Sequence, residues 1–382
     1  MANNRIFYAM QGVMLFQVGA TEVSTNGPSN EIPFPEYVYG AQEAGITTNF
    51  NLEDLFELGQ LSLYQNIEEV PDVEVSLEKV LDGRPLIYHM ATPTATGPGL
   101  SGRAGVLDKC DMRMAITRDT DTGFETGAEI VGEVYCSGMY VSDISYSMTA
   151  DGNATESVTL VGNNKIWNND TIISGDMNMG LDAPNWSAGQ GDLDTVIRRQ
   201  HFDITNTIIP IDIPGYNSSD LTGAAALDYG YKLGVNNGKT HMTSCSVSTS
   251  LGRTPILELG RKAPYFRSAD FPVDVTCDIE VISISGDLVQ AYEEGFAVAD
   301  SDRGISAGDN LGNRRIEIWL DDGTIFNLGQ KNKLQSVSYG NGGTGGGNAT
   351  MTFSYKNSSD LEVFQSGDPA GMGRANSIIG LG

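Results

Sequence analysis

Short runs in which apolar and polar residues alternate are the clearest local pattern in this chain. Residues 73–77 read Val-Glu-Val-Ser-Leu, and residues 273–276 read Val-Asp-Val-Thr. Two further runs, at 112–116 and 316–320, have the same strand character and each leads into an acidic turn. Because side chains of a strand point alternately to opposite faces, this pattern predicts β-strands with one buried face.

Helical patterns are sparse. The best candidate is 287–294, which opens on an acidic N-cap residue, Asp287, and is followed by Gly295. The matching stretch in the first half, 84–88, contains Pro85 and is compatible with a short helix or a turn. We therefore predict a mainly β protein with about one short helix in each half.

The chain repeats itself once. The tripeptide Glu-Leu-Gly occurs twice, and each copy is followed at the same spacing by a tyrosine and then a proline. These landmarks are Glu57, Tyr64 and Pro71 in the first half and Glu258, Tyr265 and Pro272 in the second. Subtraction gives 258 − 57 = 265 − 64 = 272 − 71 = 201, so the three landmarks keep one register. A fixed offset over such a length predicts two copies of one structural unit.

Later landmarks keep the same order with small shifts in offset. The strand at 73 aligns with the one at 273, an offset of 200, which predicts a one-residue slip at a bulge or turn. Ile144 aligns with Val337 at 337 − 144 = 193, and Asn153 with Asn348 at 348 − 153 = 195. Residues 168–190 are rich in Asn, Gly and Asp, so the predicted domains are 1–190 and 191–382.

Length and composition agree with two β domains. The chain has 382 residues, more than one hydrophobic core usually serves, and its 46 glycines suit many turns. Lys and Arg total 23 against 49 Asp and Glu, a formal charge of −26, with no basic cluster. This excludes a conventional nucleic-acid binder. The acidity either keeps the protein soluble or lines a wall that repels DNA.

The cysteines and the apolar segments bear on location. Cys110, Cys136, Cys245 and Cys277 show no metal-type spacing, and we expect buried thiols without disulfides. The first residues lack the pattern of a secretory signal, and no stretch approaches ~20 apolar residues. The chain is expected to be soluble, made in the host cytoplasm and not bound to membranes.

No motif supplies enzyme chemistry, so no catalytic, cofactor-binding or metal-binding residue is predicted. His89, His201 and His241 are far apart and have no metal-ligand spacing. Ser101 misses the GxSxG nucleophile motif because Arg103 replaces its last glycine. The glycine run at 342–347 lacks the Lys-Ser/Thr of a phosphate loop.

Two acidic segments resemble the start of a calcium loop. They lie at 119–123 and 300–304, and neither has a glutamate at the twelfth position. We interpret both as turns. Two other segments, 93–105 and 340–347, are too rich in Gly or Pro for strands and are expected to be exposed loops.

The repeated pattern resembles the tail tube proteins of tailed bacteriophages. The resemblance is carried by 49–88 and 140–167 in the first half and by 271–283 and 334–355 in the second. It implies two tandem tube-like β-sandwich or barrel domains, whose neighbours extend an inner sheet around a ring. Six domains from three chains then form a trimeric, pseudo-hexameric ring, and the family has no catalytic residues to transfer. The Gly- and Pro-rich segment 93–105 is our candidate for a contact between stacked rings.

The predicted function is therefore a structural virion protein of the phage tail, whose stacked rings form an acidic conduit for DNA ejection. Expected partners are further copies of the chain and other tail proteins: the tape measure, the terminator, the hub and, in a contractile tail, the sheath. DNA passes without specific binding. The first alternative is a baseplate or tail hub protein with two tube-like domains. An alternative of another class is a carbohydrate-binding adhesive β-protein that uses Trp167, Trp186 and Trp319.

Overall fold

The fold is mainly antiparallel β, with two short α-helices among the described residues, and this confirms the predicted class. The computed structural model describes residues 10–17, 36–59, 61–92, 97–103, 109–117, 130–168, 196–214, 226–227, 230–235, 240–283, 289, 312–340 and 349–365. Within this part of the chain, no helix is long and apolar enough to cross a bilayer.

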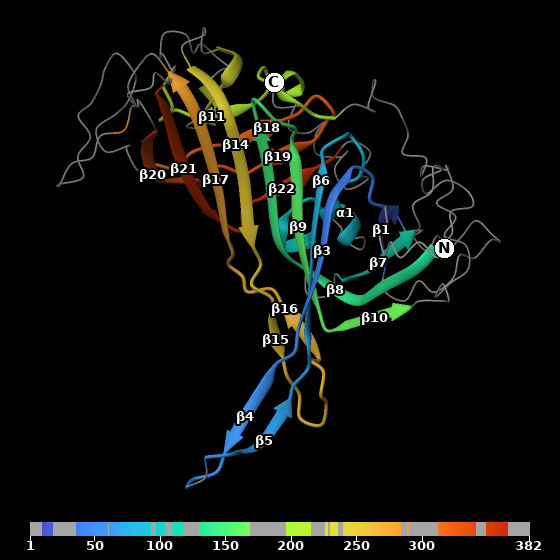
Figure 1. The fold of residues 1–382 in the computed structure, drawn as a ribbon. Helices are drawn as coiled ribbons and strands as arrows, with labels where there is room; N and C mark the ends of the chain where they lie inside the picture. Colours follow the sequence, from blue (N-terminus) through green and yellow to red (C-terminus); the bar gives the residue numbers. More distant parts are fainter. Residues whose placement is uncertain are drawn as a thin grey trace.

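Eight strands form one continuous path through the largest sheet, which runs across the upper part of Figure 1. In spatial order they are β3 (Ala41–Asn49), β6 (Asp72–Val80), β9 (Thr155–Gly162), β8 (Ile130–Thr149), β14 (Thr240–Ser250), β17 (Asp274–Ser283), β21 (Thr350–Ser358) and β20 (Lys333–Gly340). We call this path the main sheet. Its first four strands come from the first half of the chain and its last four from the second.

The two halves of the main sheet have the same strand order and the same irregularities. The order β3–β6–β9–β8 corresponds to β14–β17–β21–β20. The bulge at Gln42 in β3 recurs at Thr243 in β14, and 243 − 42 = 201. The bulge at Ser142 in β8 recurs at Gln335 in β20, and 335 − 142 = 193. These offsets equal those read from the sequence.

The sequence predicted that the offset between the two halves falls from 201 to 200 at Val73, and this was wrong, because the offset rises there. Val73 pairs with Thr48 in β3, and Val275 pairs with Thr249 in β14. Since 249 − 48 = 201, Val73 corresponds to Val275, an offset of 202 where the sequence pattern gave 200. Alternation with a period of two reads the same after a shift of two residues, so it could not separate these alignments.

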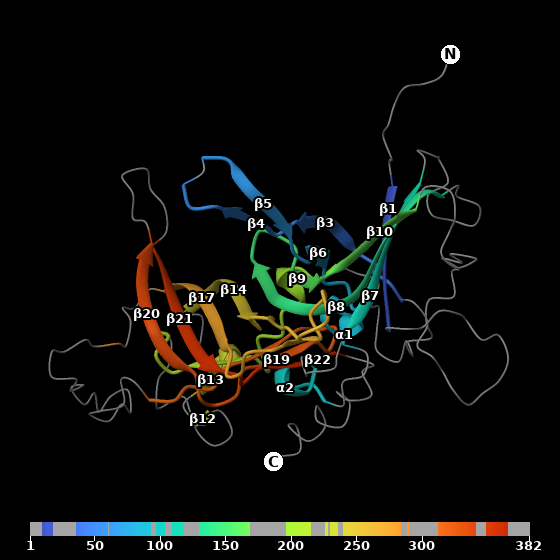
Figure 2. The same cartoon turned by 90° about the horizontal axis from the view of Figure 1, so that it is seen from below.

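A second layer packs on one face of the main sheet, and Figure 2 shows the strands of its second half, such as β13, β19 and β22, below the curved sheet. In the first half it has the order β2–β1–β7–β8–β10 and in the second β12–β13–β11–β18–β19–β22. The strands that belong to this layer alone are β1 (Met10–Gln17), β2 (Glu36–Tyr37), β7 (Cys110–Thr117), β10 (Asn164–Asn168), β11 (Ile208–Pro210), β12 (Ala226–Leu227), β13 (Gly230–Lys232), β18 (Glu317–Trp319), β19 (Ile325–Asn327) and β22 (Glu362–Phe364). The long strand β8 pairs with β7 in the second layer and with β9 in the main sheet. In the second half two separate strands do this, because β19 pairs with β18 in the second layer and β20 pairs with β21 in the main sheet.

The core lies between the two layers. Alternate residues of β9, β17 and β21 are buried, among them Val158, Leu160, Ile279 and Phe353. Each such side chain contributes roughly 1.5–3 kcal/mol through removal of apolar surface from water. The alternating runs that predicted strands at 73–77 and 112–116 lie within β6 and β7, and the centre of the run at 316–320 forms β18. The acidic turn at 321–323 is also a turn, with Gly323 at φ 86°.

Both short α-helices belong to the first half. The helix α1 (Ile87–Ala91) begins two residues after Pro85, so the stretch 84–88 is a turn followed by a helix rather than a turn alone. The helix α2 (Leu100–Arg103) is four residues long. The predicted helix 287–294 lies outside the described residues, apart from Val289.

The four cysteines are free and buried, as predicted for thiols in the core. Burial raises the pKa of Cys110 and raises that of Cys136 to about 11, so neither thiol ionises readily near neutral pH. Cys245 and Cys277 lie on the adjacent strands β14 and β17.

Part of the loop expected to be exposed is packed against its own chain. Leu100 donates its backbone N–H to the carbonyl of Leu361 at 2.9 Å, Val363 donates to Pro98 at 3.2 Å, and Leu100 is buried. The described segment 97–103 therefore covers the end of β22, although Gly and Pro residues do keep it out of the sheets. The segments 119–123, 300–304 and 341–348 and the predicted domain boundary at 190 lie outside the described residues.

Candidate assembly interface

The two halves of the chain are joined edge to edge by the pairing of β8 with β14, which we call the internal joint. The ladder runs from Asp143 opposite Ser250 to Thr149 opposite Ser244. In its middle Tyr146 faces Val247, and both side chains are fully buried. The joint therefore closes two sheet edges that would otherwise expose unpaired N–H and C=O groups.

Two buried arginines of the second half hold the internal joint from one side, and we call them the arginine clamp. Arg253 donates from Nε to the carbonyl of Val141 at 2.6 Å, and its guanidinium lies 5.3 Å from the ring centre of Tyr140. Arg267 forms an ion pair with Asp72 and donates to Oδ1 of Asn163 at 3.2 Å. Charge-assisted bonds from planar guanidinium groups fix the orientation of the two halves.

A buried carboxylate supports the same joint from the core. Glu156 accepts the backbone N–H groups of Ile87 at 2.6 Å and Tyr88 at 3.1 Å, which begin α1, and the hydroxyl of Tyr146 at 3.2 Å. Burial raises the pKa of Glu156, while the nearby charge of Lys79 and these hydrogen bonds lower it by less. Glu156 thereby ties the helix to the strand that forms the joint.

The outer strands of the main sheet, β3 and β20, have no partner on their outer side among the described residues, and we call them the open edges. Tyr339 in β20 is 65 % exposed. Thr47 and Asn49 in β3 and Ser336 and Ser338 in β20 are exposed as well. Such edges are available for pairing with another strand.

The open edges are the repeat counterparts of the two sides of the internal joint. With the offset of 193 between β8 and β20, Tyr339 corresponds to Tyr146. With the offset of 201 between β3 and β14, Ile46 corresponds to Val247. The edge β20 of one copy and the edge β3 of another therefore carry the same pattern as the joint that is closed inside each chain.

The face of the main sheet that points away from the second layer is polar and acidic, and we call it the acidic face. It is formed by the residues that alternate with the core positions, mostly Ser, Thr, Asp and Glu. Its carboxylates are Glu43, Asp72, Glu74, Glu78, Asp143, Asp274, Asp278 and Glu280, and its lysines are Lys333 and Lys356. Lys356 is 2.7 Å from Asp274, which leaves the face strongly negative.

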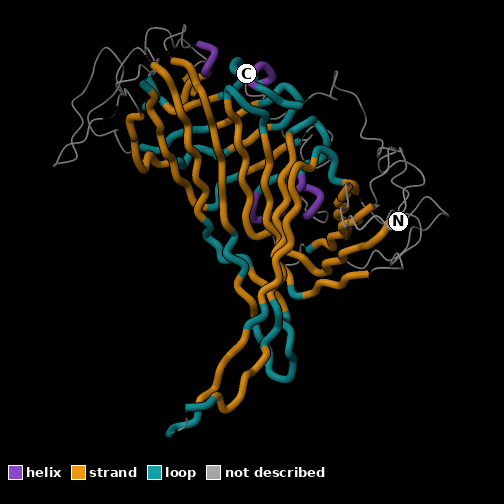
Figure 3. The backbone as a smooth tube through the Cα atoms, in the orientation of Figure 1, coloured by secondary structure: helices purple, strands orange, loops and turns teal. Residues whose placement is uncertain are grey.

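Two hairpins extend from one end of the main sheet, seen at the bottom of Figure 3. The first pairs β4 (Leu52–Phe56) with β5 (Leu63–Glu68), and the second pairs β15 (Thr254–Ile256) with β16 (Phe266–Ser268). They are repeat counterparts, because each connects the first two strands of its half. Gly59 and Gly260 in their tips have φ of 86° and 90°, which favours glycine over other residues.

The hairpin tips expose apolar side chains and carry opposite charges. Leu58 and Leu61 are fully exposed, at 102 % and 105 %, and so is Leu259 in the second hairpin. Residues 51–69 contain five acidic and no basic residues, a charge of −5, whereas 252–270 contain four basic and two acidic residues, a charge of +2. The first hairpin is thus an apolar tip on an acidic stem, and the second carries basic residues.

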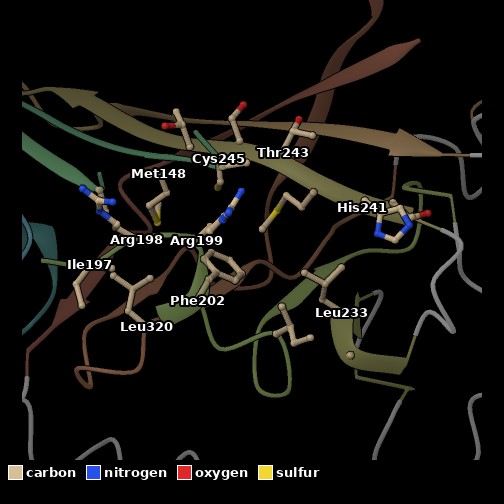
Figure 4. Close-up of a pocket in the computed structure, with 18 residues that line it drawn as sticks. Met148, Ile197, Arg198, Arg199, Phe202, Leu233, His241, Thr243, Cys245 and Leu320 are labelled. Carbon is tan, nitrogen blue, oxygen red and sulfur yellow. The ribbon is translucent and has the colours of Figure 1, made fainter. Parts of the chain in front are cut away.

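An apolar pocket of about 410 Å³ lies at the opposite end of the internal joint. The start of β14, the end of β8, the 3-10 helices η1 (Arg199–His201) and η4 (Leu233–Val235) and nearby turns form it. Its apolar lining includes Met148, Ile197, Phe202, Ile204, Leu233 and Leu320. Figure 4 shows Arg198, Arg199 and His241 beside these residues, and all three are exposed.

The histidines considered in the sequence do not come together. His89 is buried in α1, His201 is in η1, and His241 is exposed at the start of β14. Within the described residues, no group of three His, Cys, Asp or Glu side chains could hold a metal ion. Ser101 is exposed in α2. Trp167 is half exposed on β10, Trp319 is partly buried in β18, and Trp186 lies outside the described residues.

The sequence analysis used the Glu-Leu-Gly tripeptides as repeat landmarks. It did not predict that their leucines form an exposed apolar surface at the hairpin tips. An apolar residue beside a glycine, between two strands, was the available signal, because a hairpin tip leaves such a side chain in water. The pocket had no such signal, since its lining comes from five separate segments of the chain.

Comparison with known proteins gives weak structural similarity only. No family model and no curated protein matches the sequence. Among solved structures, the chain is similar to the tube-terminating cap of the anti-feeding prophage, at 15 % identity and a TM-score of 0.28, over 41 % of this chain and 87 % of that one. It is similar to a chain of the baseplate of the same particle, at 9 % identity and a TM-score of 0.30, over 45 % and 100 %.

A third similar structure is Hcp protein, at 12 % identity and a TM-score of 0.23, over 42 % of this chain and 99 % of that one. All three matches cover less than half of this chain. At such scores these similarities do not establish its function, and the proposal below is based on its own strands and edges.

Proposed function

We propose that this chain is a structural, non-enzymatic tail tube subunit of a phage particle, and that three copies close into a pseudo-hexameric ring. The observation that carries the proposal is the internal joint together with its two unpaired counterparts, β20 and β3. Each chain already joins two similar units edge to edge. Repeating the same step between chains adds units until the ring closes.

The number of chains follows from the repeat and from symmetry. If the units are the predicted domains, 1–190 and 191–382, three chains supply 3 × 2 = 6 units. Their main sheets then form one closed wall of 3 × 8 = 24 strands. Closure removes both open edges of every main sheet, which is the physical reason for a ring rather than an open oligomer.

The register of the contact between chains can be stated. The internal joint places Tyr146 opposite Val247 and Ile144 opposite Thr249. Applying the repeat offsets places Tyr339 of one chain opposite Ile46 of the next, and Val337 opposite Thr48. The exposed Tyr339 would then be buried as Tyr146 is.

The acidic face supports a role as a conduit. In a ring closed through the main sheet, with the second layer outside, this face lines the channel. Carboxylates there repel phosphates over the ~8–10 Å Debye length, so DNA passes without binding. The protein is then made in the host cytoplasm and acts in the virion tail with the tape measure, the terminator, the hub and, where present, a sheath.

The first test is electron microscopy of purified protein at increasing concentration, with averaging of end-on views. We expect rings with six lobes and a mass of three chains, followed by stacked tubes. Rings that never stack, present in one copy per particle, would favour the hub alternative. A monomer at all concentrations that binds glycans through Trp167 would contradict the proposal and favour the adhesive alternative.

A further inference from the structure

We infer that the tip of the β4–β5 hairpin of one copy docks into the apolar pocket beside the internal joint of a second copy in the next ring. The inference deepens the proposed tube function, on which its setting in stacked rings rests. It replaces the segment 93–105 as the stacking contact, because the described part of that segment is packed on its own chain.

The hairpin and the pocket lie at opposite ends of the main sheet. The start of β14, at Thr240 to Cys245, lines the pocket, and the end of β14 leads through Gly252 into the second hairpin. The first hairpin extends from the same end, as Figure 3 shows. A hairpin therefore cannot reach the pocket of its own chain, and it meets one only in a copy stacked along the same direction.

The apolar surfaces of the two partners match in kind. Leu58 and Leu61 at the tip are fully exposed in the isolated chain. The pocket offers about 410 Å³ among Met148, Phe202 and other apolar side chains, and Ile204 at its opening is 53 % exposed. Two leucines at a tip and an open apolar cavity both expose surface that association would remove from water.

Charge selects the first hairpin over the second. The stem of the first carries Glu53, Asp54 and Glu57 and no basic residue, whereas the tip of the second carries Arg261 and Lys262. The pocket is bordered by Arg198 and Arg199, which are exposed. Opposite charges attract the acidic hairpin and like charges reject the basic one.

The contact is heterologous, because the surface on one copy differs from the surface on the other. A contact of this type leaves a free hairpin at one end and a free pocket at the other, so layers add without limit. This geometry suits a tube of many rings.

Charge reversal tests the contact. Glu57→Arg and Arg199→Glu should each lower the fraction of protein found in tubes about tenfold or more, because each places like charges together. The double variant should restore tubes. The control is Glu258→Arg at the matching position of the second hairpin, where Glu258 forms an ion pair with Arg261 of its own hairpin at 3.6 Å. This control should assemble as the wild type does.

A crosslink separates this inference from the proposed function. Cysteines introduced as Leu58→Cys and Ile204→Cys cannot meet within one chain, and the four native cysteines are buried. Oxidation should therefore give covalent chain-to-chain multimers. Crosslinks without rings would support the docking and overturn the tube proposal. Rings without crosslinks, with tubes unaffected by either charge reversal, would overturn the docking and leave the tube proposal standing.

Discussion

The internal joint and the open edges are the same structure in two states. Tyr146 at the joint is completely buried against Val247, while its counterpart Tyr339 at the edge is 65 % exposed. The backbone bulges, the strand order and the alternation are the same on both. The difference supports the proposal that each open edge forms one half of a joint with another chain.

The two regions also differ in their polar support. The arginine clamp of the internal joint, Arg253 and Arg267, corresponds by the offset of 201 to Leu52 and Asn66 in the first half. The counterpart of Asp72 is Asp274, which pairs with Lys356 of its own chain. The proposed joint between chains would therefore lack the clamp, and we expect it to be weaker than the joint within each chain.

The largest expected effect is the difference in free energy of unfolding between variants of Tyr146 and Tyr339. Tyr146→Ala should lower the free energy of unfolding by about 3–5 kcal/mol, because it leaves a cavity in a full core. Tyr339→Ala should change the free energy of unfolding of the isolated chain by less than about 1 kcal/mol, since most of that side chain is exposed. Denaturant unfolding at a concentration below assembly measures both. Equal losses for the two variants would contradict the comparison.

The next effect concerns assembly. Tyr339→Lys should raise the concentration needed for ring formation roughly 100-fold, because about 2.8 kcal/mol of apolar burial is lost at each contact. Ser338→Lys is the matched control, since Ser338 lies on the opposite face of the same strand and its lysine stays in solvent. Analytical ultracentrifugation gives both concentrations. Similar curves for the two lysine variants would show that β20 is not the contact.

A smaller gain is expected from transferring part of the clamp. Asn66→Arg should reach Asp274 of the neighbouring chain as Arg267 reaches Asp72, and should tighten ring formation by up to about fivefold. The gain should shrink at high salt because exposed ion pairs are screened. Combining it with Asp274→Asn should remove the gain, and a gain that survives would show that the arginine acts elsewhere.

The smallest effect is a pH dependence at the internal joint. Burial raises the pKa of Glu156 in the folded chain, so ionising this group costs more in the folded state than in the unfolded state. Its contribution is complete below the ordinary glutamate pKa and declines as pH rises through the folded pKa. The stability of the wild type relative to Glu156→Gln should therefore fall as the pH rises above about 4. A rise over this range would contradict the assignment.

The sequence predicted what repeats locally and missed what depends on distant contacts. Alternation in 73–77 and 316–320 and the offset of 201 gave the strands and the duplication, because both are properties of short segments. It misplaced the slip between Val73 and Val275, since a period of two cannot detect a two-residue shift.

The assembly surfaces required the fold. The pairing of β8 with β14 joins segments about 100 residues apart, and only this contact reveals β20 and β3 as matching edges. The exposure of Leu58 and the pocket near Leu233 likewise follow from tertiary packing. Tyr146 and Tyr339 look alike in the sequence, and their surroundings alone distinguish them.

One measurement tests the central claim most directly. Cysteines introduced as Ile46→Cys and Tyr339→Cys should face each other across the contact between chains, as Val247 and Tyr146 do within one chain. Oxidation of assembled protein should give a covalently closed trimer on a denaturing gel, and the pair Ile46→Cys with Ser338→Cys, on opposite faces, should not crosslink. A ladder without a trimer limit, or only monomers from assembled rings, would contradict the account.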